Sequence, residues 1–89
     1  MDRFRGVIQS HRFERELRKA EPDPRKADDL ISALEFALAR HPERGFPIPD
    51  TALSIWPIYV RDRELVAYYR YDESTVELVS LLAGQEEPW

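Results

Sequence analysis

Three arginines close to tyrosines are the residues of this chain best suited to chemistry. Arg61 and Arg63 lie in one charged turn between two β-rich runs, and Arg70 directly follows Tyr68 and Tyr69. Guanidinium groups can hold a phosphate in bidentate hydrogen bonds, and a tyrosine can stack on a base or transfer a proton. The three arginines, together with one of these tyrosines, are therefore the candidates for a phosphate site.

The same residues also fit an ordinary structural role. Asp62 and Glu64 alternate with the two turn arginines and weaken an anion clamp, so a solvated hairpin turn is favoured there. Aromatic residues are common in β-sheets, and a core or interface role is favoured for Tyr68 and Tyr69 over base stacking. For Arg70 the sequence favours neither role.

Other kinds of site chemistry have no support. The chain has no cysteine, which excludes a disulfide, a thiolate zinc site and a cysteine nucleophile. His11 and His41 lie on different predicted elements, no serine lies in a nucleophile elbow, and three scattered glycines cannot form a phosphate-binding loop. The sequence therefore predicts neither a metal nor a cofactor.

Charge divides the chain into a basic start and an acidic remainder. Residues 1–26 hold eight Lys or Arg against five acids, and residues 27–89 hold five against twelve, giving net charges of +3 and −7. The overall charge of −4 argues against broad affinity for nucleic acid, which needs basic surface to neutralise phosphates. Two interpretations stay open: the basic segment meets an acidic partner, or the acidic remainder of the same fold neutralises it.

Length and hydropathy predict one small domain over residues 1–89, with a short loose tail over 84–89. No apolar run approaches the roughly 18 residues that span a bilayer, and the first residues do not resemble a signal peptide. Together with the absence of cysteine, these features predict a cytoplasmic protein that does not contact a membrane.

Two amphipathic helices are predicted in the first half of the chain. Ser10 has the character of an N-cap for a helix over 11–20, and Asp23 with Pro24 marks the start of a second helix over 23–40. Apolar residues recur in both with a helical period. They are Phe13, Leu17 and Ala20 in the first helix, and Ala27, Leu30, Ile31, Leu34, Ala37 and Leu38 in the second.

Strands are predicted on either side of these helices. The connector over 41–50 contains three prolines and a glycine and is expected to be extended and irregular. Pro57 either interrupts its strand or places it at a sheet edge, because proline donates no ladder hydrogen bond. The β-rich runs are 4–8, 53–60, 65–71 and 75–82.

The resulting order β-α-α-β-β-β predicts an α+β fold, with a two-helix hairpin packed on one face of a small, mostly antiparallel sheet. The other sheet face is left uncovered and suits a partner. Alternation along one strand separates the two faces. Leu65, Ala67, Tyr69 and Tyr71 share one face, which is expected to face the core, and Val66, Tyr68 and Arg70 share the other, which is too mixed for a dry core.

Three segments resemble the RelE/ParE superfamily of bacterial toxins. They are residues 33–49, which end in a His-Pro-x-x-Gly-x-x-Ile connector, residues 65–73, which contain Tyr-Arg-Tyr-Asp, and residues 76–82. The resemblance covers roughly residues 4–85 and implies the same element order. It also implies the toxin half of a type II toxin–antitoxin pair, whose partner is a small antitoxin protein.

The residues depart from the family pattern where catalysis would occur. Family members that cleave mRNA on the ribosome carry an arginine where this chain has Leu65 and Val66, and they use a Tyr, His or Lys near the chain end. Here residues 83–85 offer no such group. Arg61, Arg63, Arg70 and Tyr69 are the remaining candidates for that chemistry, and binding without catalysis is favoured.

Binding to an antitoxin is thus the leading hypothesis. Arg12, Arg15 and Lys19 on the first helix are predicted to receive acidic side chains from a disordered antitoxin segment, and Tyr68 on the open face is a further partner-binding candidate. The alternatives are a ribosome-dependent mRNA endoribonuclease, a gyrase poison of the ParE kind, and a non-toxic homodimer of the same fold.

Overall fold

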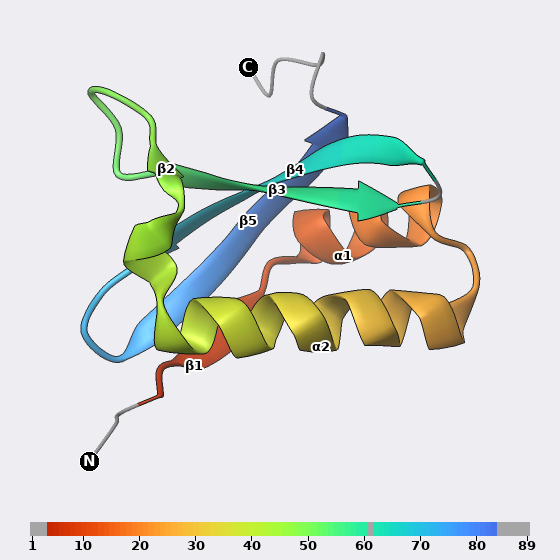
Figure 1. The fold of residues 1–89 in the computed structure, drawn as a ribbon, viewed down its shortest axis with the longest axis horizontal. Helices are drawn as coiled ribbons and strands as arrows, with labels where there is room; N and C mark the ends of the chain where they lie inside the picture. Colours follow the sequence, from red (N-terminus) through yellow and green to blue (C-terminus); the bar gives the residue numbers. More distant parts are fainter. Residues whose placement is uncertain (1–3, 61, 84–89) are drawn as a thin grey trace.

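The computed structural model describes residues 4–60 and 62–83, in which two helices pack against one five-stranded sheet (Figure 1). The predicted α+β class and the order of helices and longer strands are confirmed. The elements are β1 (Gly6–Gln9), α1 (His11–Ala20), α2 (Pro24–Arg40), the 3₁₀ helix η1 (Pro42–Arg44), β2 (Phe46–Pro47), β3 (Ser54–Val60), β4 (Arg63–Tyr71) and β5 (Thr75–Ala83).

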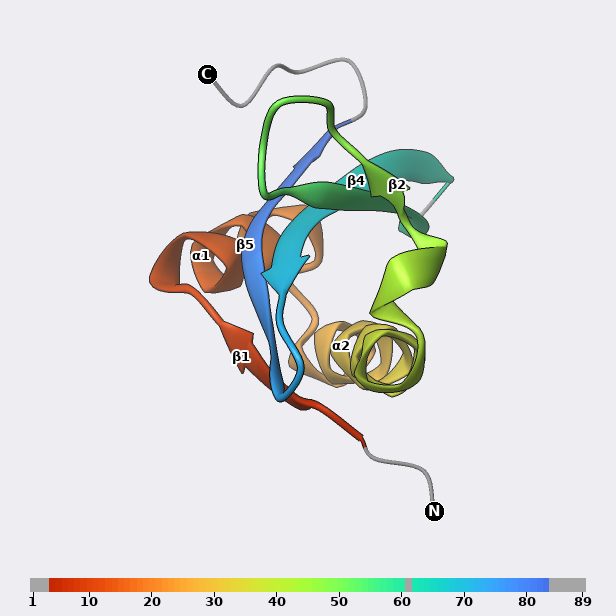
Figure 2. The same ribbon diagram turned by 90° about the vertical axis from the view of Figure 1, so that its left-hand side faces the viewer.

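The sheet has the strand order β1-β5-β4-β3-β2. β1 runs parallel to β5, and the other three pairings are antiparallel, as the prediction of a mostly antiparallel sheet requires. Figure 2, in which α2 is seen end-on, shows β1 and β2 on opposite sides of the molecule. The chain therefore crosses the whole sheet between its first and second strands, through the two helices.

The expectation of an irregular connector over 41–50 is wrong in part. Pro42 opens a turn of 3₁₀ helix, where its fixed φ is favourable and its missing N–H is not needed. Phe46 and Pro47 then pair with Ile55 and Ser54 as a two-residue edge strand. The prolines of this connector are therefore compatible with a 3₁₀ turn and a two-residue strand.

Pro57 lies in an uninterrupted strand, so the edge interpretation of its strand is confirmed. It pairs with Val66 of β4 on one side of β3. On the other side β2 covers only Ser54 and Ile55, which leaves Pro57 at a free edge. Its missing N–H costs no ladder hydrogen bond, and a proline at this position discourages edge-to-edge pairing with another sheet.

Side-chain caps begin both helices where the sequence predicts them. The Ser10 hydroxyl accepts a hydrogen bond from the Phe13 N–H at 3.0 Å, and the Asp23 carboxylate accepts one from the Arg25 N–H at 3.0 Å. These bonds satisfy N–H groups that have no partner within a helix. The caps therefore fix where each amphipathic stripe starts, and with it which residues face the sheet.

One hydrophobic core joins both helices to one face of the sheet. Leu65, Ala67 and Tyr69 are buried as predicted, but Tyr71 is 41% exposed and does not belong to the core. The helices contribute Phe13, Leu17, Leu34 and Leu38, and β5 contributes Val76, Leu78 and Leu81. On the opposite face Tyr68 is half-buried and Arg70 exposed, whereas Val66 is only 8% exposed.

A β-bulge in β5 changes which residues of that strand face the core. Tyr68 pairs with Ser80 and Tyr69 with Leu78, so Val79 is an extra residue without an opposite partner. Before the bulge Val76 and Leu78 face the core, and after it the alternation resumes one residue later, with Leu81. Ser80 therefore does not belong to the core, and its hydroxyl contacts Glu16 of α1.

Gly45 is required by the packing between the connector and the sheet. A Cβ atom there would overlap the Tyr69 hydroxyl and lie 2.7 Å from the Ile55 carbonyl oxygen. We expect Gly45→Ala to lower the free energy of unfolding by about 1–3 kcal/mol, the usual range for overpacking. The measurement is urea denaturation.

Gly6→Ala is the matched control, because a Cβ atom at Gly6 meets no atom within 4 Å. Its unfolding midpoint should stay close to that of the parent chain. Equal effects of the two substitutions would show that the contact between Gly45 and Tyr69 is not what matters.

Candidate functional site

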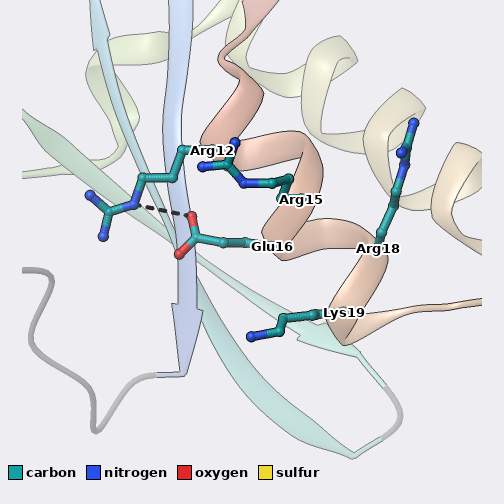
Figure 3. Close-up of a pocket in the computed structure, with 5 residues that line it drawn as sticks. All are labelled: Arg12, Arg15, Glu16, Arg18 and Lys19. Atoms are coloured by element: carbon teal, nitrogen blue, oxygen red, sulfur yellow. Dashed lines mark ion pairs between the residues drawn. The ribbon is translucent and has the colours of Figure 1, made fainter.

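The helix α1 carries four of the eight Lys and Arg residues of the basic segment 1–26. Figure 3 shows a hollow lined by Arg12, Arg15, Glu16, Arg18 and Lys19, in which Arg12, Arg15 and Lys19 point to the side where Glu16 lies and Arg18 points away. Arg15 and Lys19 are exposed, and within residues 4–60 and 62–83 neither forms an ion pair. The structure thus brings together the three cations predicted to bind a partner.

Glu16 holds α1 against the outer edge of β5. Its Oε1 accepts hydrogen bonds from the Ser80 hydroxyl at 2.8 Å and from the Leu81 N–H at 3.0 Å, and it lies 3.7 Å from Arg12 Nε. Ser80 is only 1% exposed. One carboxylate therefore satisfies two groups that the bulge turns toward the helix, and it neutralises part of the charge of Arg12.

A second hollow continues from the basic face of α1 to the ends of β4 and β5. Glu16 and Lys19 line both hollows, so the two hollows adjoin. The second adds Arg63 at its rim, and its apolar lining comes from Ala20, Leu65, Leu81, Leu82 and Ala83. Arg63 and Lys19 therefore line the same hollow. We call the two adjoining hollows together the α1–β5 groove.

The arginines proposed for phosphate chemistry do not share a site. Arg63 and Arg70 lie at opposite ends of β4, seven residues and roughly 23 Å apart, and alternation puts them on opposite faces. Arg70 pairs with Glu77 of the neighbouring strand. Arg61 lies outside the described residues. Within the part of the chain that the structure describes, no phosphate clamp is formed from these residues.

Tyr69, the proposed proton-transfer group, is fully buried. Its hydroxyl donates a hydrogen bond to the Pro42 carbonyl oxygen, and burial raises the pKa of Tyr69 to about 12. Proton transfer requires contact with a substrate, which this ring does not offer. The hydroxyl holds η1 against β4, and Tyr69 acts in the core, as the favoured structural interpretation expected.

The open face of the sheet has few free cations. Ile8 and Tyr59 are exposed apolar groups there, 56% and 71% exposed. Arg70 is paired with Glu77, and Glu64 is exposed on the same face. Because acids neutralise the basic groups of this face, the part of it that the structure describes suits a protein surface better than a phosphate chain.

Sequence reasoning did not identify Glu16 or place Arg63 beside α1. The pairing of Arg12 with Glu16 has the ordinary i, i+4 spacing of a solvated helix face, so nothing marked Glu16 as an anchor. The sequence groups Arg63 with Arg61 because only Asp62 separates them. Arg63 and Lys19 come close together only in the fold, because Glu16 holds α1 beside the bulged end of β5.

No metal centre is visible in residues 4–60 and 62–83: no three His, Asp or Glu side chains lie close enough to hold an ion. Among the same residues, neither helix has the length and hydrophobicity needed to cross a membrane.

The fold has a solved counterpart over nearly its whole length. The chain superposes on a chain of the toxin–antitoxin complex RelBE2 from Mycobacterium tuberculosis with a TM-score of 0.70 and 21% identity, covering 97% of each chain. No family model matches the sequence, and no curated protein matches it. The chain therefore has the RelE-like fold that its sequence motifs implied.

Glu16 is the side chain whose loss should most weaken the attachment of α1 to β5. In Glu16→Ala the Leu81 N–H and the Ser80 hydroxyl lose their shared acceptor, which should cost about 1–3 kcal/mol of unfolding free energy. Glu14→Ala removes an acid of the same helix that makes only a half-exposed contact with His11, and should cost less than about 0.5 kcal/mol. Chemical denaturation of both variants would contradict the assignment if the losses were equal.

The Tyr69 hydroxyl should make stability fall at high pH. A tyrosine pKa of about 10 in the unfolded chain and about 12 in the folded chain means that the neutral form is favoured by folding. The contribution of the neutral Tyr69 to the free energy of unfolding is therefore fully present below about pH 10 and is lost as pH rises toward 12. Tyr69→Phe should be less stable at neutral pH but lose less between pH 10 and 12, with Tyr59→Phe as the exposed control. Parallel denaturation profiles for parent and Tyr69→Phe would contradict this.

Proposed function

We propose that this chain is the toxin-type component of a bacterial type II toxin–antitoxin pair, acting in the cytoplasm by binding a small antitoxin protein. The observation that carries the proposal is the match over 97% of both chains to a protein solved as part of a toxin–antitoxin complex. The class of partner is taken from that neighbour. The charge and shape of α1 support it independently, because unpaired exposed cations beside apolar surface favour an anionic polypeptide.

Arg12, Arg15 and Lys19 are the proposed contacts for acidic side chains of the antitoxin. Arg15 and Lys19 offer charge that the described residues do not neutralise, whereas Arg12 shares Glu16. Tyr68, half-buried on the open face, is proposed as a separate apolar contact. A disordered antitoxin segment that wraps the molecule would reach both surfaces.

Binding is favoured over mRNA cleavage. Catalysis of phosphodiester cleavage needs cations and a proton-transfer group around one phosphate. Of the residues proposed for it, Arg70 is paired, Arg63 lies on the opposite face and Tyr69 is buried. A toxin that blocks its target by binding needs none of these groups.

The test is inducible expression in a bacterium, alone and together with each small open reading frame that adjoins the gene. We expect growth arrest that coexpression relieves, and a complex that copurifies. Falling translation with cut transcripts would instead support a ribonuclease, failing DNA replication a gyrase poison, and normal growth of a self-associating chain a homodimer. Normal growth with no copurifying partner would contradict the proposal.

Removing Arg15 and Lys19, two α1 cations that form no ion pair within residues 4–60 and 62–83, should weaken the copurified complex. Arg15→Ala/Lys19→Ala should raise its Kd by about tenfold and flatten its dependence on salt, because two ion pairs would be lost at the interface. Arg25→Ala/Lys26→Ala changes the net charge equally on exposed residues of α2 and should leave Kd close to that of the parent chain. Titration calorimetry at two salt concentrations gives both values; equal weakening by the two variants would rule out α1 as the contact.

A further inference from the structure

We propose that the α1–β5 groove binds an acidic segment of a protein partner in extended form, by adding a short strand to the outer edge of β5. The inference deepens the proposed function and rests on it for the identity of the partner. Its structural basis is the combination, in one groove, of an incomplete strand edge, an apolar floor and a cationic rim.

The edge of β5 is only partly covered. β1 pairs with residues Thr75 to Leu78, and the Ser10 N–H bonds to the Leu78 carbonyl, so the neighbouring strand ends there. Beyond this point side chains of α1 and of its N-cap residue bond to the strand: the Ser10 hydroxyl donates to the Val79 carbonyl, and Glu16 accepts the Leu81 N–H. The Val79 carbonyl and the Leu81 N–H thus have side-chain partners where a strand would otherwise pair.

Outward-pointing backbone N–H and C=O groups continue along β5 to the end of the strand. In an antiparallel pairing, the N–H and C=O of one residue point to the same side, and every second residue points away from the neighbouring strand. Because the Leu81 N–H points outward to Glu16, the Leu81 carbonyl and the polar groups of Ala83 point to that side as well. These are the groups that an added strand pairs with.

The groove around this edge specifies the chemistry of its occupant. Ala20, Leu65 and Leu81 supply apolar contacts, and Lys19 and Arg63 lie at the rim with Arg15 on the continuing face of α1. Glu16 is the only acid that lines either hollow among the described residues, and it is engaged by Ser80 and Leu81. An extended segment that alternates acidic and apolar side chains matches both features.

A peptide is favoured over a nucleic acid as the occupant. The N–H and C=O groups of a strand edge pair with the backbone of another polypeptide. The apolar side chains of the groove offer no hydrogen-bond donor to a phosphate. The net charge of −4 also repels a polyanion at long range, whereas a short peptide with a few glutamates is held by the local cations.

The test uses the full chain and a synthetic peptide of four Glu-Val pairs, with a peptide of four Lys-Val pairs as control. We expect the acidic peptide to bind and the basic peptide not to bind. Arg63→Ala/Lys19→Ala should weaken the acidic peptide at least tenfold, and Arg25→Ala/Lys26→Ala should not. Equal binding of the two peptides, or equal weakening by the two double variants, would overturn the inference.

Strand addition itself is tested by hydrogen exchange at the backbone. The Ala83 N–H should exchange more slowly when the acidic peptide is bound, and Ala83→Pro, which removes this donor at the strand end, should reduce binding at least tenfold while the unfolding midpoint stays close to that of the parent chain. Binding without added protection at Ala83 would contradict the strand.

Two further outcomes separate this inference from the proposed function. If the coexpressed small protein copurifies but does not compete with the acidic peptide, the groove assignment is wrong and the toxin-type function stands. If the peptide binds as expected and expression neither arrests growth nor yields a partner, the toxin-type function is wrong.

Discussion

The bulge at Val79 is the constraint on which the rest of the arrangement depends. Without it, strict alternation would direct Ser80 into the core and turn Leu81 away from it. With it, Leu81 packs into the core while its N–H and the Ser80 hydroxyl meet Glu16. That contact fixes α1 along the edge of β5, and the position of α1 places the cations of the groove.

The two surfaces of the molecule have different electrostatic character. Near α1 the acid that lines the groove is engaged in structural hydrogen bonds, so Arg15 and Lys19 keep their charge available. On the open sheet face Arg70 is paired with Glu77. Of these two surfaces, the α1 face therefore attracts an anionic partner more strongly, although the protein as a whole is acidic. This local separation of charge explains how an acidic chain can present a basic interface.

Local signals predicted most of the fold. Ser10 and Asp23 as caps, the helical period of the apolar residues and the alternation over β4 gave the elements, their order and the core face, because each depends on neighbours in sequence. The bulge, the parallel pairing of β1 with β5 and the distance between Arg63 and Arg70 depend on contacts between distant segments. For that reason the sequence grouped the arginines into one site that the fold separates, whereas Arg12, Arg15 and Lys19, the predicted partner contacts, share one helix face.

Hydrogen–deuterium exchange of the protein alone and in complex with the small protein that copurifies with it tests the central claim most directly. We predict slower exchange on binding in α1 (His11–Ala20) and over residues 79–83, with little change at the N-terminal turns of α2. Protection confined to the open face of β3 and β4, with α1 unchanged, would contradict the assignment of α1 and the edge of β5 as the partner-binding surface.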